Sequence, residues 1–400
     1  MLDTIDTALL GEAGDLLEET SRLRRRIHQH PELGLQLPST QATLLEALAP
    51  LGLTTRQGTT TTSLTAMIDG DHEGPTILLR ADMDALPMHE DTEVTFPSLD
   101  DHAMHACGHD LHVSMLVGAA KLLHARRKEL HGRVLLMFQP GEEGFHGARF
   151  MLEDGLLDGV GTVDRAFAIH ATTVAPTGFV ALKGGSIMAS ADEFLITVKG
   201  RGGHASAPHQ ALDPIPIACE IVQALQLMVT RRIDVFDPGV ITVGRITAGT
   251  TNNVIPEIAE IEGTIRAVSE ATRKKLHDGL RRVADGIVAA HDAEATVRLI
   301  PGFPVTVNDD HVAGEVLRVA GALLGDHSVR RMPSPVMGAE DFSYVLQQVP
   351  GAMAFLGATP KGINPFTAAP NHSNRVTFDE NAMPTGMALY AAMALDHLSG

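Results

Sequence analysis

Five side chains of the kind that bind transition metals are spread over most of this sequence. They are Cys107, His109, one glutamate of the pair Glu142 and Glu143, His170 and His372. One thiol, three imidazoles and a carboxylate form a suitable ligand set for first-row divalent ions. If all five converge on one site, the chain must return to its first domain near its end, because His372 lies far along the sequence from His170. The segment between them is then an insertion.

The spacing of Cys107 and His109 matters more than their residue types. An isolated cysteine is usually a small buried apolar residue, and an isolated histidine is more often a surface or hydrogen-bonded core residue than a ligand. Here Gly108 separates the two donors and allows both to turn toward one centre, just ahead of an apolar segment. A thiol nucleophile paired with its second neighbour His109 is a poorer alternative, because such close neighbours rarely meet in the required geometry.

Glu142 and Glu143 form an adjacent pair between Gly141 and Gly144. Two carboxylates held together need compensating positive charge, or one of them stays protonated. Metal ions supply such charge. One glutamate of the pair can then bind metal while its neighbour accepts a proton from water.

The N-terminal part of the chain has the rhythm of an α/β domain with a mainly parallel sheet. Short apolar runs predict strands and longer segments predict helices: strands at 76–80, 133–138 and 165–169, helices at 14–30 and 111–124. Ligands of such sheets collect outside the carboxyl ends of the strands. Asp84, Glu142, Glu143 and His170 fall at these ends. Asp84 is expected either to cap its loop or to orient a ligand imidazole.

The pattern of apolar and polar residues changes in the middle of the chain, where it predicts the βαββαβ order of a ferredoxin-like unit. Its expected elements are strand 192–199, helix 213–231, strands 239–246 and 257–267, helix 270–290 and strand 294–300. We therefore expect an inserted domain over 186–300 and a catalytic, metal-binding domain built from 1–185 and 301–400. Helices near 310–324 and 383–397 complete the latter.

Composition narrows the partners and the location. A net charge of −18 makes nucleic acid or an anionic membrane an unlikely partner for the whole chain. The first residues lack a basic segment followed by an apolar run, so we expect no signal peptide. Apolar runs are too short for a transmembrane helix. Two cysteines form no disulfide framework, and the cytoplasm is the expected location.

Taken together, the motifs resemble the aminoacylase and carboxypeptidase family of dinuclear metallohydrolases. Within it, the chain is similar to the hippurate hydrolase, N-acyl-amino-acid amidohydrolase and indole-acetyl-amino-acid hydrolase subgroup. The resemblance runs nearly end to end. The matching segments are His30-Pro-Glu-Leu-Gly34, Leu79-Arg-Ala-Asp-Met-Asp-Ala-Leu-Pro87, His105-Ala-Cys-Gly-His-Asp110, Phe138-Gln-Pro-Gly-Glu-Glu143, Gly203-His-Ala, Pro208-His, Asp213-Pro, Asn253-Val-Ile-Pro256, Gly263-Thr-Ile-Arg266 and Gly338-Ala-Glu-Asp-Phe342.

The resemblance implies roles for individual residues. Cys107 would bridge two divalent metal ions, and Asp84 would support a ligand without touching metal. Glu142 would be the general base and later the acid toward the leaving amine. The remaining metal ligands would be His109, Glu143, His170 and His372. Thiolate and imidazole suit Zn²⁺, while Mn²⁺, Co²⁺ or Ni²⁺ also occur in hydrolytic sites of two metals.

The resemblance also implies that the inserted domain acts as a lid and mediates a homodimer. His204 and Asn253 would hold the scissile carbonyl or the substrate carboxylate, with His204 reaching across the dimer. Arg266 is a candidate carboxylate clamp, which suits its planar fork of donors. One departure is Leu35-Gln-Leu37, where the family often has an acidic residue. We expect Leu37 and its neighbours to affect packing or pocket lining rather than chemistry.

The expected activity is that of a metal-dependent amidohydrolase. It would cleave N-acyl or N-aroyl amino acids, such as hippurate-like or N-acetyl amino acids, to a carboxylic acid and an amino acid. Alternatives on the same site are a dipeptidase or carboxypeptidase and a biosynthetic deacetylase of N-acetyl amino acids. A metal-binding module without catalysis is the rival from another class, although it needs no spare base such as Glu142. A structural zinc protein would hold one metal per chain rather than two.

Overall fold

A computed structural model describes residues 6–399 of the chain. The chain divides into two compact units, described separately below. The first unit contains residues up to Gly185 together with Val307–Ser334 and the stretch from Asp341 onward, and the inserted unit contains Ser186–Thr306 and Pro335–Glu340. Residues 1–5, on which the expected lack of a signal peptide rests, lie outside the described residues.

The first unit is built on a sheet with the strand order β1-β2-β4-β3-β5-β16-β6-β15. Its four central strands are parallel: β4 (His131–Gln139), β3 (His72–Asp82), β5 (Val163–Pro176) and β16 (Gly351–Thr359). The outer strands are β2 (Leu64–Asp69), β1 (Thr54–Gln57), β6 (Val180–Leu182) and β15 (Val329–Arg331). The predicted α/β class with a mainly parallel sheet is confirmed.

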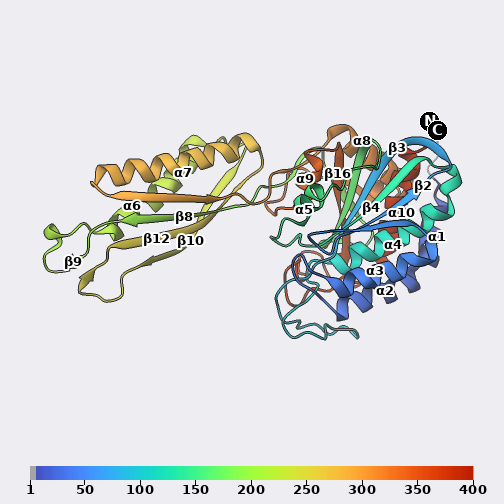
Figure 1. Ribbon diagram of the computed structural model, residues 1–400, viewed down its shortest axis with the longest axis horizontal. Coiled ribbons are helices and arrows are strands. Elements are labelled where there is room, and N and C mark those ends of the chain that lie inside the picture. Colours follow the sequence, from blue (N-terminus) through green and yellow to red (C-terminus); the bar gives the residue numbers. More distant parts are fainter. Residues whose placement is uncertain (1–5, 400) are drawn as a thin grey trace. The chain divides into compact units, whose positions relative to one another are not determined.

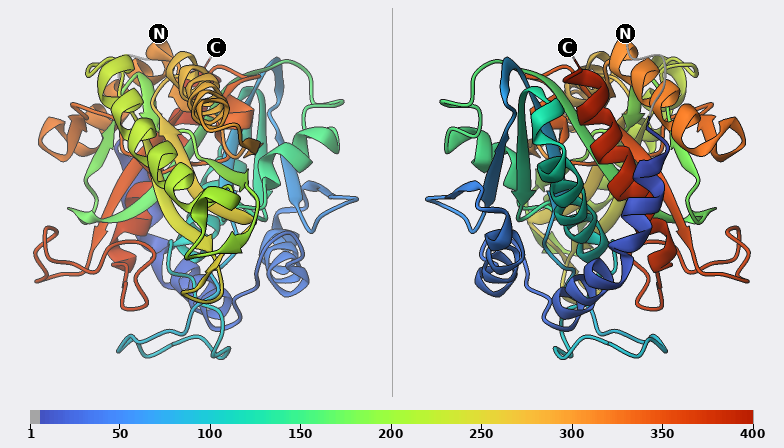
Figure 2. Two further views of the ribbon diagram at one scale, coloured as in Figure 1. Left: turned by 90° about the vertical axis from the view of Figure 1, so that its left-hand side faces the viewer. Right: turned by 90° about the vertical axis from the view of Figure 1, so that its right-hand side faces the viewer.

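Helices cover this sheet in two layers. α4 (His109–Ala125) and α10 (Met383–His397) pack side by side against the central strands, and α1 (Ala8–Asp15) and α2 (Leu17–Gln29) pack on them from outside (Figure 2, right). Because α4 and α10 lie between two layers, they are apolar on nearly all sides. The other helices of this unit are α3 (Pro38–Leu48), α5 (Gly147–Glu153), α8 (Asp310–Leu324) and α9 (Ser343–Leu346).

Most predicted elements of this unit are a few residues longer in the structure, and two differ from the prediction more strongly. The single helix expected over 14–30 is two helices, α1 and α2, which meet at Leu16 in a tighter turn whose N–H donates to the Ala13 carbonyl. The strand expected over 165–169 continues to Pro176, so His170 lies inside β5 rather than at its end. His170 nevertheless lies just beyond Ala168, the last residue of β5 that pairs with β3, because β5 extends further than β3.

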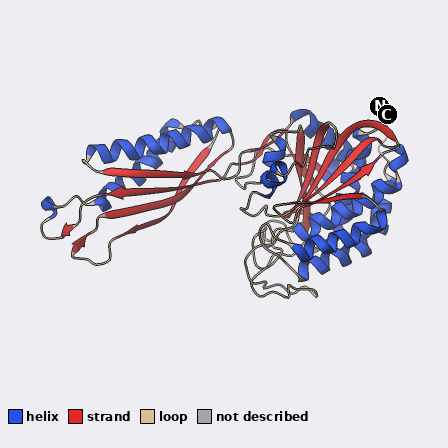
Figure 3. Cartoon of the chain, in the orientation of Figure 1, coloured by secondary structure: helices blue, strands red, loops and turns tan. Residues whose placement is uncertain are grey.

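The inserted unit has the predicted βαββαβ order. Two helices pack together on one face of a four-stranded antiparallel sheet with the order β10-β12-β8-β13 (Figures 1 and 3). Alternate residues of β8, namely Phe194, Ile196 and Val198, are buried under the helices. The elements are β8 (Asp192–Lys199), α6 (Pro214–Arg232), β10 (Gly239–Ala248), β12 (Ile258–Ala267), α7 (Glu270–Ala290) and β13 (Glu294–Ile300).

Short strand pairs complete the architecture. β9 (Gly203–His204) pairs with β11 (Val254–Ile255), and β7 (Gly185–Met188) pairs with β14 (Thr306–Asn308). Among the described residues, no helix combines the length and apolar character needed to cross a bilayer.

Candidate metal centre

Cys107 and His109 lie at the turn that begins α4. Gly108 between them adopts a left-handed conformation with φ of +85°, which few side chains tolerate. A Cβ at this position would also lie 3.2 Å from the Phe378 ring. The tight turn brings the buried thiol and the buried imidazole to the same side of the sheet edge. The prediction that Gly108 acts as the hinge of this pair agrees with this geometry.

Hydrogen bonds fix the protonated nitrogen of two imidazoles. His170 Nδ1 lies 2.9 Å from the Ala171 carbonyl, and His109 Nδ1 lies 2.8 Å from the Asp84 carbonyl. A carbonyl oxygen can only accept, so each Nδ1 carries the proton when the ring is neutral, and each Nε2 presents a lone pair. His170 Nε2 lies 3.5 Å from Cys107 Sγ. Both rings are therefore oriented as metal ligands usually are.

The Glu142–Glu143 pair lies in the loop after β4. Gly141 and Gly144 have positive φ values of 69° and 85° and shape this loop. The backbone N–H groups of Glu142 and Glu143 both donate to the Asp84 carboxylate, at 2.9 and 3.0 Å. Asp84 thus holds the loop with its side chain and His109 with its backbone carbonyl. The expected support of an imidazole comes mainly from the carbonyl, since the carboxylate lies 3.5 Å from His109 Nδ1.

Two groups of three ligating atoms overlap at Cys107. In the first group, the ligating atoms of Cys107, His109 and His170 lie within 4.8 Å of one another. In the second, those of Cys107, Glu143 and His372 do the same. The structure therefore brings together all five side chains proposed as ligands. Cys107 is the one residue common to both groups.

His372 reaches this cluster from the C-terminal part of the chain. It is one of three non-glycine residues with positive φ among the described residues, at 68°. Its N–H donates to the Ala106 carbonyl at 2.9 Å, and Nδ2 of the preceding Asn371 lies 3.0 Å from the Ala171 carbonyl. These contacts explain how a strained residue stays close to Cys107.

The unsatisfied polar atoms of the cluster fit a cation. His109 Nε2 and Glu143 Oε1 are buried without a hydrogen-bond partner among the described residues, although Glu143 Oε1 lies 3.1 Å from His372 Nε2. Burial alone would raise the pKa of the Cys107 thiol, but the surrounding imidazoles, His170 foremost, hold it well below its usual range. Burial raises the pKa of Glu143. A sulfur, nitrogen and oxygen donor set with orphaned lone pairs is what a divalent transition metal requires.

A further layer of side chains lies behind these ligands. His112 Nδ1 donates to Asp82 Oδ1 at 2.6 Å, and its Nε2 accepts from the Ala171 N–H at 2.7 Å. Burial opposes the charge of Asp82, yet the Arg80 guanidinium and the nearby imidazoles hold its pKa well below its usual range. His112 follows His109 by three positions, which places both on one helix face. The sequence left His112 open as a support of the ligands or as a surface residue, and its burial and hydrogen bonds agree with the first of these.

The similarity of this chain to known proteins identifies its family. The sequence model of peptidase family M20/M25/M40 matches residues 78–396, which include every candidate metal ligand. The chain belongs to this family. It is 40% identical over 380 residues to thermostable carboxypeptidase 2 of Saccharolobus solfataricus, with 94% of each protein covered. It is 38% identical over 378 residues to N-acetylcysteine deacetylase of Bacillus subtilis, covering 93% of this chain and 95% of the relative.

A plant relative and a solved structure extend the comparison. IAA-amino acid hydrolase ILR1-like 2 of Arabidopsis thaliana is 38% identical over 400 residues, with 98% of this chain and 89% of the relative covered. The crystal structure of Bacillus subtilis YxeP, described as a dinuclear metal-binding peptidase of the M20 family, matches with a TM-score of 0.84 and 33% identity over 96% of this chain and 99% of that one. This M20 protein is a metal-dependent amidohydrolase of amino-acid derivatives.

Two of the three proposed substrate-binding residues of this M20 hydrolase lie together in the inserted unit. His204 in β9 pairs with Val254 in β11, and the Ala205 N–H donates to the Asn253 carbonyl at 3.1 Å. Arg266 lies near the other end of the inserted unit. β12 begins at Ile258, shortly after β11, and Arg266 follows Ile258 by eight positions, which is about 26 Å along the strand. Arg266 Nη1 donates to the Met337 carbonyl at 2.9 Å. Within the inserted unit of one chain, Arg266 and His204 are too far apart to hold the same small molecule.

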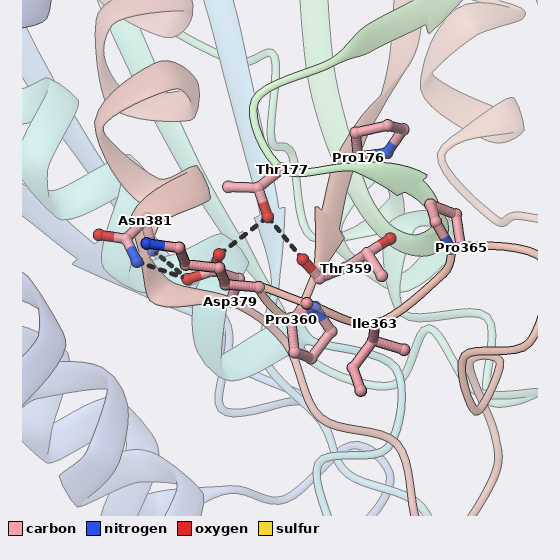
Figure 4. Close-up of a pocket in the computed structure, with 10 residues that line it drawn as sticks. Pro176, Thr177, Thr359, Pro360, Ile363, Pro365, Asp379 and Asn381 are labelled. Carbon is pink, nitrogen blue, oxygen red and sulfur yellow. Dashed lines mark hydrogen bonds between the residues drawn. The ribbon is translucent and has the colours of Figure 1, made fainter.

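A cavity of about 490 Å³ in the first unit of the M20 hydrolase lies apart from the metal ligands. Its walls come from the ends of β5 and β16 and from the loops that follow (Figure 4). The Thr177 hydroxyl lies 2.7 Å from the Thr359 carbonyl and 2.9 Å from Asp379 Oδ2, two acceptors that share its single O–H. None of the five candidate ligands lines this cavity.

Proposed function

We propose that this M20 amidohydrolase cleaves N-acyl amino acids to a carboxylic acid and a free amino acid, with two divalent metal ions. The observation that carries the proposal is the pair of ligand groups sharing Cys107, with a second carboxylate, Glu142, beside His109 and the ligand Glu143. The names of two relatives support the substrate class, since one is an N-acetylcysteine deacetylase and another an IAA-amino acid hydrolase. The dinuclear description of YxeP supports the metal count.

Cys107 would contact both ions. His109 and His170 would complete one site, and Glu143 and His372 the other. When bound, the ions polarise the amide carbonyl and lower the pKa of water. Imidazole and thiolate donors suit Zn²⁺, and Mn²⁺, Co²⁺ or Ni²⁺ also fit the donor set. A thiol ligand requires a reduced cysteine, which supports a reducing compartment such as the cytoplasm.

Glu142 would be the base. Its carboxyl group is buried, and Asp84 fixes the backbone N–H of both Glu142 and Glu143. Glu142 would accept a proton from water as the water oxygen bonds to the carbonyl carbon. The same carboxyl group would then donate this proton to the amide nitrogen as the C–N bond breaks. The products are a carboxylic acid and an amine, so atoms and charge balance.

Residues of the inserted unit would bind the rest of the substrate. We assign His204 and Asn253 to the scissile carbonyl or the substrate carboxylate, in a homodimer in which the inserted unit acts as lid and dimerisation module. Arg266 is proposed as a carboxylate clamp. Its guanidinium has five N–H donors, so the contact with the Met337 carbonyl leaves donors for a carboxylate.

A substrate panel with matched metal analysis tests the proposal. Hippurate, N-acetyl amino acids and dipeptides are each assayed with Mn²⁺, Zn²⁺, Co²⁺ or Ni²⁺. We expect hydrolysis of the N-acyl amino acids and two ions per chain. In Glu142→Gln, turnover should fall by at least about 10³-fold while the metal content stays at two, because only the proton acceptor is lost. Retained turnover in this variant would contradict the mechanism.

A carboxypeptidase is the second candidate, because a relative with 40% identity carries that name. The same panel separates the two functions. Cleavage of dipeptides or longer peptides at their carboxyl end, without cleavage of N-acetyl or N-benzoyl amino acids, would favour the carboxypeptidase. One ion per chain and no hydrolysis of any amide would instead indicate a structural metal site.

A further inference from the structure

Asp341 closes the base of the loop that carries Glu142 and Glu143. It belongs to the motif Gly338-Ala-Glu-Asp-Phe342, to which the sequence alone assigns no role. Asp341 is fully buried, and its Oδ1 accepts from Gln139 Nε2 at 2.6 Å. Its Oδ2 accepts from the Ala148 N–H at 2.9 Å. Gln139 is the last residue of β4 and Ala148 lies in the first turn of α5. One carboxylate therefore joins the two ends of the loop.

A second contact from the same segment reaches the loop. The Tyr344 hydroxyl lies 2.9 Å from His146 Nδ1. His146 precedes α5 and has a φ of +59°. A left-handed conformation is unfavourable for a residue other than glycine. Surrounding contacts must hold such a residue in place, and Asp341 and Tyr344 supply contacts on this side of the loop.

Arg80 connects this clamp to the metal ligands. Its buried guanidinium donates to Gln139 Oε1 at 2.8 Å and to Asp82 Oδ2 at 2.7 Å, and it lies 3.3 Å from Asp341 Oδ1. Asp82 in turn binds His112 and lies 3.6 Å from His109 Nε2. Because buried ion pairs of this kind tolerate little displacement, the network fixes the base of the loop relative to the His109 side of the metal centre.

We propose that Asp341 is a positioning residue for the general base. It holds the Glu142 loop at its two ends while Asp84 holds it at its middle. This inference rests on the proposed function, because Glu142 must be the base for its position to set the rate. Loss of the clamp should lower kcat, since a displacement of about 1 Å can cost about 10²-fold in rate. KM and metal content should change little, because the Asp341 carboxylate holds Gln139, Arg80 and the Ala148 N–H, and none of these is a proposed ligand.

Asp341→Asn tests this at constant shape. The new amide must direct its NH₂ either at the Ala148 N–H or at the donors of Gln139 and Arg80, so donor faces donor. We expect kcat to fall by about 10²-fold on a substrate that the wild type cleaves, with KM within about twofold and metal content unchanged. The double variant Gln139→Glu/Asp341→Asn exchanges carboxylate and amide across the same hydrogen bond. The new carboxylate at position 139 accepts from Arg80 Nε and from the new NH₂ at position 341, and the amide oxygen at 341 accepts from the Ala148 N–H. Only the 3.3 Å contact of Arg80 Nη2 loses its acceptor, so this variant should recover most of kcat.

Asn308→Ala is the matched control for stability. The Asn308 side chain is buried in the first unit and hydrogen-bonds the backbone of Lys183 and Met353. Its removal should lower Tm at least as much as Asp341→Asn and leave kcat unchanged at temperatures well below Tm. Undiminished kcat in Asp341→Asn, an equal loss in Asn308→Ala, or a folded double variant without recovery would each overturn the proposal. Failure of the proposed function is distinguishable, because it shows as a wild type inactive on the panel or as an active Glu142→Gln.

Discussion

Gly141 offers a sharp test of how the base is positioned, because it directly precedes Glu142. Its φ is +69°, and a Cβ at this position would lie 2.5 Å from Leu35 Cδ2 and 3.0 Å from Phe145 Cβ. Gly141→Ala therefore imposes two separate penalties. The left-handed conformation costs about 1–2 kcal/mol, and the new methyl group collides with Leu35.

The collision sets the size of the expected effect. Ordinary contact begins near 3.4 Å, so the 2.5 Å approach must open by about 0.9 Å. Either the flexible end of Leu35 or the loop must move by that amount. A displacement of about 1 Å at a catalytic group can lower the rate by about 10²-fold. We expect kcat to fall by about 10- to 100-fold, depending on how the movement is divided.

Two variants separate strain from collision. Gly144→Ala in the same loop has φ of +85° but no atom within 4 Å of the new Cβ, so it carries the strain without the collision. It should lower Tm while leaving kcat nearly unchanged. Leu35→Ala combined with Gly141→Ala removes the obstructing methyl groups and should recover most of kcat. The assay is kcat and KM on an N-acyl amino acid, with Tm and metal content measured on each variant.

An unchanged kcat in Gly141→Ala, or an equal loss of activity in Gly144→Ala, would show that the collision does not displace the general base. Failure of the Leu35→Ala double variant to recover would equally show that Leu35 does not press on the loop. Recovery would give a role to the Leu35-Gln-Leu37 segment, which departs from the acidic residue common in the family. That role is packing against the loop of the base, the kind of effect expected from the sequence.

Two other predictions concern stability. Burial opposes the charge of His28, but its hydrogen bonds with Asp110 and Glu90 raise its pKa to about 9 from 6.5. Because the folded state raises this pKa, the charged imidazole contributes stability that is complete below pH 6.5 and is lost as the pH rises through 9. The Tm of the wild type should therefore fall over this range, and the Tm of His28→Gln should depend less on pH. Chelation should abolish turnover and lower Tm, and ions added at about 100 times Kd should restore about 2.7 kcal/mol. An unchanged Tm after complete removal of metal would contradict the proposed centre.

Local signals explain why much of the inserted unit was predictable. The strand over 192–199 alternates buried and exposed residues, and the helix over 270–290 begins after Ser269, whose hydroxyl accepts from the Thr272 N–H. Both signals lie within a few residues of the element they define. The predicted bounds of these elements therefore agree with the structure. Helix α8, capped by Asp309, follows the same rule.

Features that depend on distant parts of the chain were not predictable in this way. β16 consists largely of small apolar residues without alternation, and it becomes a strand by pairing with β5 across a long stretch of sequence. The hydrogen bonds of Asp341 likewise depend on distant parts of the chain, because Arg80, Gln139 and Asp341 come from three separate segments. The candidate ligands were predictable because each lies in a short motif. The carboxylate of Asp84 was expected at an imidazole, and no local pattern indicated that it would bind two backbone N–H groups.

The charges around the loop of the base give an independent reason to expect metal ions. Five carboxyl groups, Asp82, Asp84, Glu142, Glu143 and Asp341, are wholly or largely withdrawn from solvent in the first unit. Arg80 is the buried guanidinium among them. When all six groups are ionised, five negative charges and one positive charge leave four negative charges, before any charge on the Cys107 thiol. Although burial opposes charge on His109, the Asp82 carboxylate raises its pKa, and Cys107 and Glu143 raise that of His372 to about 10, so these imidazoles offset part of the excess. Buried charges without partners are costly, and divalent ions bound by the same imidazoles would offset the excess in their place.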